Sequence, residues 1–214
     1  MDRGAEGRRG SVGGAEGLRG GGGVLFHSCE RPPAMAHLWH DLPPGAKAPQ
    51  VVRAVIEIPG GSKNKYELDK ESGLLKLDRV LFSAVHYPAD YGFIPGTLGG
   101  DGDPLDILVL LTEPSFPGCL MEVRPLGVLE LRDEGERDEK ILGVLLKDPL
   151  DEEYRKLSDV PDYLRKEIEQ FFRTYKDLEE DKDPPKVRGW RPRPEAHRAI
   201  RKAIKRYDAA YRGG

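Results

Sequence analysis

Short apolar runs, none longer than a single β-strand, dominate the chain from residue 51 to residue 147. Many of their residues are β-branched, and clusters of Gly, Pro, Asp and Glu separate them, which is typical of strands joined by turns. We expect strands at residues 51–58, 65–69, 74–81, 106–112, 119–130 and 140–147. Because many short strands follow one another closely, the pattern favours a barrel or a sandwich.

The periodicity changes after Pro161. Residues 162–178 place apolar side chains at helical spacing with charges between them, and residues 194–211 repeat this pattern. A short return strand is expected between them, at 187–190. The sequence therefore predicts a mainly β fold with flanking helices (α+β), in which a barrel-like body is followed by two C-terminal helices.

The first 34 residues differ in composition from the rest. They are rich in Gly and Arg and contain few apolar residues, so they bury too little surface to offset the entropy of ordering. We expect a disordered extension at 1–34 and one globular domain at 35–214. The extension lacks the apolar core of a secretory signal. Our hypothesis is that it is an overlong start and that the working chain begins near Met35.

Bulk composition disfavours several classes of protein. The net charge is only −3 and both signs are interspersed, which argues against nucleic-acid binding. No apolar stretch approaches the roughly 20 residues that cross a bilayer, so we expect no membrane association. Cys29 and Cys119 lie far apart and match no metal or redox spacing. A cytoplasmic location is the simplest expectation.

The acidic run at residues 101–106 is the most distinctive segment. Three carboxylates, Asp101, Asp103 and Asp106, crowd a turn that leads directly into an apolar strand. Most Asp-rich turns are simply solvated. Here the last carboxylate opens a strand expected to be buried, and mutual repulsion favours a hard divalent cation such as Mg²⁺. The run is not an EF-hand loop, because no Glu closes it at the twelfth position.

A second acidic segment, residues 133–140, lies between two expected strands and could bring further carboxylates to the same site. Alone it is a weak signal, because most charged hairpin loops are merely exposed.

Several segments together resemble the soluble (family I) inorganic pyrophosphatases, the magnesium-dependent type of prokaryotic length. The resemblance extends from about residue 42 to residue 211 and rests on segments that occur in the expected order. These are 55–59, 65–67, 78–79, 87–95, 101–106, 124–128, 175–179 and 186–190. Asp90 departs from the family pattern, where many members carry Asn, and so does His86. We assign neither a chemical role, and for His86 an incidental or packing histidine is favoured over an influence on metal binding.

The resemblance implies an OB-like, five-stranded closed β-barrel with two C-terminal helices. It further implies hydrolysis of inorganic pyrophosphate to two orthophosphates by a Mg²⁺-activated water or hydroxide that attacks the electrophilic phosphoryl group. Several Mg²⁺ ions per active site are implied, with Mn²⁺ or Zn²⁺ as substitutes. The expected assembly is a homohexamer in the cytoplasm.

The resemblance also implies which residues form the active site. Asp103 is the expected general base. The expected metal ligands are Asp101, Asp106, Asp138, Asp133 and Glu57. The expected substrate-binding residues are Lys65, Arg79, Tyr91, Lys140, Tyr175 and Lys176. Glu67 and Tyr87 are expected in support, through metal-bound water and by orienting the base. For Tyr175, core packing is the alternative.

Two other functions are alternatives for this sequence. An OB-like barrel can bind oligonucleotides, but the distinctive loops here are acidic rather than basic and aromatic. A hydrolase of another phosphoanhydride or phosphoester, such as a nucleotide, is disfavoured because residues 60–63 lack the Walker spacing.

Overall fold

The computed structural model describes residues 36–133, 135–180 and 184–213. The predicted extension at 1–34 lies outside the described residues, so that boundary stays a prediction. The strands are β1 (Val52–Ile58), β2 (Asn64–Leu68), β3 (Leu75–Val80), β4 (Asp90–Ile94), β5 (Leu105–Leu110), β6 (Leu120–Asp133), β7 (Glu136–Leu145) and β8 (Lys186–Pro192). The helices are α1 (Pro149–Glu153), the 3₁₀ turn η1 (Leu157–Asp159), α2 (Asp162–Thr174) and α3 (Arg193–Tyr211).

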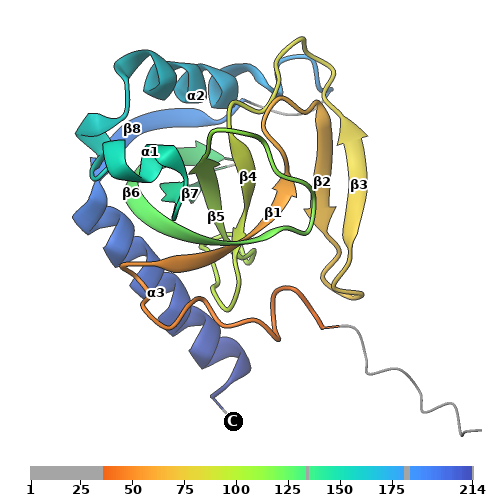
Figure 1. The fold of residues 1–214 in the computed structure, drawn as a ribbon. Helices are drawn as coiled ribbons and strands as arrows, with labels where there is room; N and C mark the ends of the chain where they lie inside the picture. Colours follow the sequence, from red (N-terminus) through yellow and green to blue (C-terminus); the bar gives the residue numbers. More distant parts are fainter. Residues whose placement is uncertain (1–35, 134, 181–183, 214) are drawn as a thin grey trace, which may run out of the picture. The chain divides into compact units, whose positions relative to one another are not determined.

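Strand pairing forms a ring. In the six-stranded sheet, the order β1-β4-β5-β7-β6 returns to β1 through an additional β1–β6 pairing, and β8 is added to β6. The hairpin β2–β3 is a separate two-stranded sheet that stands beside the ring (Figure 1). The mainly β, OB-like body with two C-terminal helices, α2 and α3, is therefore confirmed.

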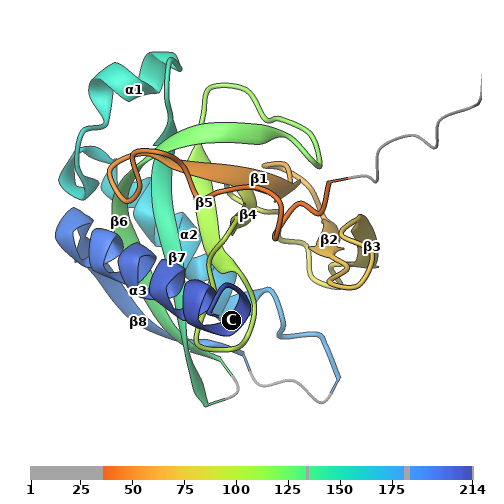
Figure 2. The same ribbon diagram turned by 90° about the horizontal axis from the view of Figure 1, so that it is seen from below.

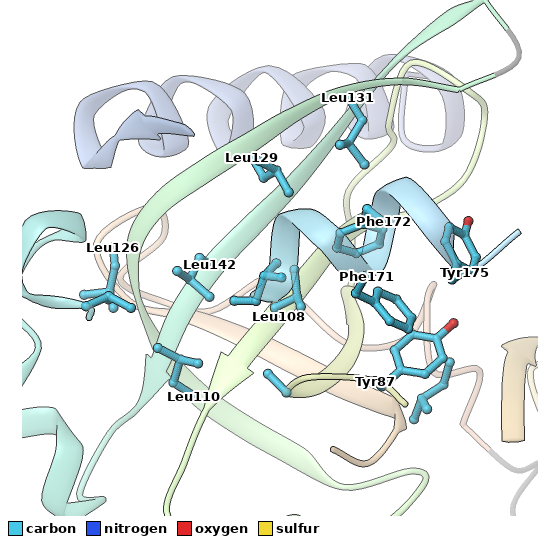
Figure 3. Packing of buried hydrophobic residues seen from close by; sticks show 14 of the residues in the cluster. Tyr87, Leu108, Leu110, Leu126, Leu129, Leu131, Leu142, Phe171, Phe172 and Tyr175 are labelled. Atoms are coloured by element: carbon cyan, nitrogen blue, oxygen red, sulfur yellow. The ribbon is translucent and has the colours of Figure 1, made fainter. Parts of the chain in front are cut away.

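The two long helices pack against different apolar clusters. Ile168, Phe171 and Phe172 of α2 join Leu108 of β5 and Leu142 of β7 in one cluster (Figure 3). In the second cluster, α3 residues including Ala196 and Ile200 pack with the neighbouring positions of the same two strands, Ile107 and Ile141. Figure 2 shows α3 from below the ring. Because β5 and β7 are buried on both faces, their apolar runs are continuous rather than alternating.

Three local expectations need correction. The acidic segment 133–140 is not a long loop, because β6 extends to Asp133 and β7 begins at Glu136. The helix expected to reach residue 178 ends at Thr174, with Tyr175 as its C-cap, and a turn follows. Neither β4 nor the short α1 and η1 were predicted. Among the described residues, no helix is long and apolar enough to span a membrane.

Candidate active site

A pocket of about 810 Å³ opens between the hairpin β2–β3 and the ring. It gathers side chains from five strands of the ring, from both strands of the hairpin and from the turn after α2. The predicted site residues that line it are Glu57, Lys65, Glu67, Arg79, Tyr91, Asp101, Asp103, Asp106, Asp133, Asp138, Lys140, Tyr175 and Lys176. Of the predicted residues, Tyr87 is not in the lining; it is buried behind it.

The local fold explains how the carboxylates meet. Asp101 and Asp103 lie in the loop before β5, where Asp101 Oδ1 accepts a hydrogen bond of 3.0 Å from the Asp103 N–H. Gly102 between them has φ +85°, a conformation that favours glycine. The parallel pairing of β5 with β7, with Ile107 opposite Ile141, then brings Asp106 beside residues 138–140.

Burial and mutual repulsion raise the pKa values of these carboxyls. Burial, followed by the charge of Asp106, raises the pKa of Glu57 to about 8. The pKa of Asp106 is raised to about 6 by burial and by Asp138, against the opposing effect of Lys140. Burial also raises the pKa of Asp101, with Asp138 and Asp103 adding to it. The pocket therefore concentrates negative charge that a cation would stabilise.

Lys140 supplies one such cation. Its Nζ lies 2.8 Å from Asp138 Oδ2 and also donates to Asp106 Oδ2. It is 5.7 Å from the centre of the Tyr91 ring and 5.9 Å from that of Phe172. Burial alone would lower the pKa of Lys140, but the two carboxylates outweigh burial and raise it well above its usual value. The ammonium is thus fixed in its charged form.

Lys176 makes a second buried contact across the pocket. Its Nζ donates to Asp133 Oδ2 at 2.6 Å, which joins the turn after α2 to the end of β6. Asp133 Oδ1 is buried and has no hydrogen-bond partner among the described residues. A buried carboxylate oxygen without a partner is costly, and a cation or water would complete it.

The hairpin contributes a mixed group of charges. Lys65 Nζ contacts Glu67 and, at 3.5 Å, Asp78 Oδ2. Burial lowers the pKa of Lys65, and the neighbouring charge of Arg79 lowers it further. The guanidinium of Arg79 is held by Glu179, with Nη2 at 2.7 Å from both carboxylate oxygens.

The three tyrosines remain phenols. Burial raises the pKa of Tyr87, Tyr91 and Tyr175 far above neutrality, so each hydroxyl keeps its proton and can donate it in a hydrogen bond. Tyr175 stacks on Phe171 with ring centres 5.2 Å apart and also lines the pocket, so the packing and site interpretations both hold for its position (Figure 3). Tyr87 packs 4.7 Å from Phe171 and 5.4 Å from Tyr91.

The donor set fits a hard divalent cation. All the oxygen ligands expected from the sequence face one pocket, and the pKa values of Glu57 and Asp106 are raised by burial and by neighbouring carboxylates. Asp133 Oδ1 is buried and has no hydrogen-bond partner in the described part of the chain. Carboxylate oxygens are what Mg²⁺ prefers. In the described part of the chain, however, no three acidic, imidazole or thiol side chains stand close enough together to enclose an ion. The ammonium of Lys140 lies between the carboxylates of Asp106 and Asp138 and contacts both.

Sequence reasoning missed four charged residues around the pocket, one of which, Glu136 at the start of β7, lies within the second acidic segment. Lys70 lines it and forms an ion pair with Asp103, and Asp78 lines it beside Lys65. Glu179 lies behind Arg79. Asp78 and Glu179 fall within the segments that carry the resemblance, which was the available signal; nothing in the sequence marks Lys70.

The two departures from the family pattern lie away from the chemistry. His86 is exposed and does not line the pocket, which agrees with an incidental histidine and not with a packing one. Asp90 is fully buried, and its two oxygens accept hydrogen bonds from the N–H of Gly60 at 2.8 Å and the N–H of Ser115 at 3.0 Å. Asp90 thus joins three segments of backbone.

Comparison with known proteins gives one consistent result. A model of the inorganic pyrophosphatase family matches residues 54–208. The chain is 51% identical over 174 residues to an inorganic pyrophosphatase from Thermus thermophilus, which covers 81% of this chain and 99% of the relative. It is 46% identical over 177 residues to one from Halobacterium salinarum, covering 83% of this chain and 99% of that protein. The crystal structure of the Thermus thermophilus enzyme superposes with a TM-score of 0.78 at 50% identity, over 81% of this chain and 99% of that one.

Proposed function

The chain belongs to the inorganic pyrophosphatase family and is a hydrolase of diphosphate. On that basis we propose that the residues of the pocket carry out the reaction and divide its roles among them. In this proposal some carboxylates hold Mg²⁺, Asp103 takes the proton from the attacking water, and the cations and phenols bind the phosphoryl oxygens. Support comes from the pocket, which collects these residues from segments far apart in the sequence.

The metal-holding residues are Asp101, Asp106 and Asp138, with Asp133 and Glu57 in addition. When bound, Mg²⁺ would lower the pKa of water and neutralise charge on the attacked and leaving oxygens. The raised pKa values of Asp101 and Asp106 indicate carboxylates that gain from a nearby cation. Glu57 and Glu67 would act through ordered water.

Asp103 is suited to accept a proton. Its side chain is 51% exposed, against 20% for that of Asp106 in β5. Its backbone is fixed by the hydrogen bond to Asp101, and Lys70 holds its carboxylate at the pocket edge. A general base needs this combination of a fixed position and a reachable oxygen.

The phosphoryl oxygens would be bound by Lys65, Arg79, Lys140 and Lys176. Each of these cations lines the pocket, so together they offset the charge of pyrophosphate from several sides. Tyr91 and Tyr175 keep their protons and would donate hydrogen bonds to the leaving phosphate.

The test is phosphate release from pyrophosphate with Mg²⁺ by Asp103→Asn and Asp106→Asn. We expect a fall in kcat of about 10²- to 10⁴-fold for Asp103→Asn, the usual effect of losing a general base. Asp208→Asn is a matched control on α3, where the carboxylate pairs with the exposed Arg212. Full activity of both pocket variants would refute the proposed roles.

Assembly and location are also proposed from the family resemblance. A homohexamer would cover apolar side chains that the hairpin region leaves exposed, including Leu77, Val80 and Phe82. Light scattering during size-exclusion chromatography tests this, and a monomer mass at micromolar concentration would refute it. The free Cys119 fits a reducing cytoplasm, which cell fractionation would test.

A further inference from the structure

Arg79 depends on a residue outside the pocket. It lies on β3, in the two-stranded sheet that is not part of the ring, so strand pairing to the ring does not fix its position. Its guanidinium instead contacts Glu179, which is 100 residues later in the chain, in the turn after α2.

The contact engages one edge of the guanidinium. Arg79 Nε donates to Glu179 Oε1 at 3.0 Å, and Nη2 lies 2.7 Å from both Oε1 and Oε2. The other end, Nη1, faces Asp78 Oδ2, which lines the pocket. Because a guanidinium is planar and rigid, fixing the Nε–Nη2 edge also fixes the direction of Nη1.

The contact is protected from solvent on the carboxylate side. The Glu179 side chain is 5% exposed, compared with 19% for Arg79 and 33% for Asp78. The contact of Arg79 with Glu179 is therefore better shielded from solvent than its contact with Asp78. A phosphoryl group that enters the pocket meets the Nη1 end, where it can displace Asp78, and leaves the Glu179 edge in place.

The charge of Glu179 also matters for the neighbouring cation. Lys65 and Arg79 line the same pocket, and their repulsion disfavours two positive charges there. A buried carboxylate on the far side of the guanidinium offsets that repulsion without occupying the pocket.

We propose that Glu179 is the positioning residue for Arg79: it holds the Nε–Nη2 edge so that Nη1 points at a phosphoryl oxygen of the substrate. This inference rests on the proposed role of Arg79 in binding pyrophosphate. It assigns no contact between Glu179 and the substrate, so the effect of Glu179 on the KM for pyrophosphate should pass through Arg79.

The experiment is a double-mutant cycle of Glu179→Gln and Arg79→Ala, with kcat and KM for magnesium pyrophosphate measured by phosphate release. We expect Glu179→Gln to raise KM and to lower kcat/KM about tenfold or more, which is the effect of a misplaced charge-assisted contact. Added to Arg79→Ala, Glu179→Gln should change kcat/KM by less than about twofold, because the group it acts through is gone. Glu169→Gln is the matched control, since Glu169 forms an exposed pair with Arg173 on α2; it should behave as wild type.

The outcomes separate the inference from the function on which it rests. The inference would be overturned if Glu179→Gln lowered kcat/KM equally with and without Arg79. It would also be overturned if Glu179→Gln left KM unchanged and lowered kcat only in proportion to the fraction of folded protein. Either result would show a purely structural role. A defective Arg79→Ala with a normal Glu179→Gln would overturn the inference alone. An unaffected Arg79→Ala would refute the role of Arg79 in substrate binding and the inference with it. If Glu179→Gln does not fold, Glu179→Asp, which keeps the charge, takes its place in the double-mutant cycle, and kcat and KM are measured in the same way.

Discussion

Lys176 Nζ lies 2.6 Å from Asp133 Oδ2, and this contact holds the turn after α2 against the end of β6. Both groups are proposed parts of the machinery, but in the metal-free protein they balance one another. Removing the ammonium leaves a buried carboxylate whose other oxygen already has no partner.

We therefore expect Lys176→Ala to lower the free energy of unfolding of the metal-free protein by about 1–3 kcal/mol. Saturating Mg²⁺ should recover part of this loss, because a metal ion replaces the missing cation beside Asp133. Urea unfolding with EDTA and with Mg²⁺ measures both values. Lys166→Ala, which removes an exposed pair on α2, is the control and should leave the free energy of unfolding close to that of wild type. An equal loss with and without Mg²⁺ would contradict the expectation.

Glu57 should make the stability of the metal-free protein depend on pH. Its pKa is raised to about 8 in the folded state by burial and then by Asp106, against about 4.3 when unfolded. Between about pH 4.3 and about pH 8 the folded state binds more protons at Glu57 than the unfolded state does. The free energy of unfolding therefore falls as the pH rises, and the loss is complete above about pH 8. Glu57→Gln should therefore be more stable than wild type at pH 8.5, by up to about 4 kcal/mol, and equal to it below pH 4.

Urea unfolding in EDTA across pH 4–9 measures this difference. Glu122→Gln, at an exposed position on β6, is the matched control. A difference between wild type and Glu57→Gln that stays constant from pH 5 to pH 8.5 would contradict the assignment of the raised pKa to Glu57.

Asp90 should be needed as a carboxylate. Its oxygens accept hydrogen bonds from the N–H of Gly60 and from both the N–H and the hydroxyl of Ser115, so these three partners all act as donors. In Asp90→Asn the amide NH₂ must face at least one of these donors, and we expect a loss of about 1–3 kcal/mol. Thermal unfolding at fixed pH measures the change. Asp90→Asn together with Ser115→Ala should recover little, because the Ser115 N–H still needs an acceptor; full recovery would refute this account.

Gly92 should tolerate no side chain. A Cβ at this position would lie 1.9 Å from the carbonyl oxygen of Val55 and 2.8 Å from Cα of Ile56, so β4 could not stay paired with β1. We expect Gly92→Ala to cost at least about 2 kcal/mol or to prevent folding. Chemical denaturation measures the loss, and a wild-type midpoint would contradict the predicted close approach.

β4 also shows where sequence reasoning fails. The strand was not predicted because it begins with a charged residue, contains Gly92 and has no alternation, although it is central to the ring. Burial of Asp90 and the close approach at Gly92 are tertiary features, which no local pattern reports. The runs that became β5 and β7 were predicted because burial on both faces leaves a continuous apolar signal.

The same distinction applies to the site. Family-like segments gave the residues that gather in the pocket, but not the pairs they form. These pairs depend on contacts between distant segments. Lys140 contacts Asp106, 34 residues earlier, and Glu179 contacts Arg79, 100 residues earlier. The charged start of β7 resembled an exposed loop. Glu136 and Arg137 are indeed exposed, but Asp138 and Lys140 are buried as an ion pair, which no local pattern reports.

The parallel pairing of β5 with β7 has a consequence for synthesis of the chain. Asp106 lies at the start of β5, but its partner strand is made only after the intervening β6, and Lys176 follows later still. A nascent chain therefore carries Asp106 before Lys140, the cation that pairs with it, has been made. The buried ion pair can form only after both β6 and β7 have been translated.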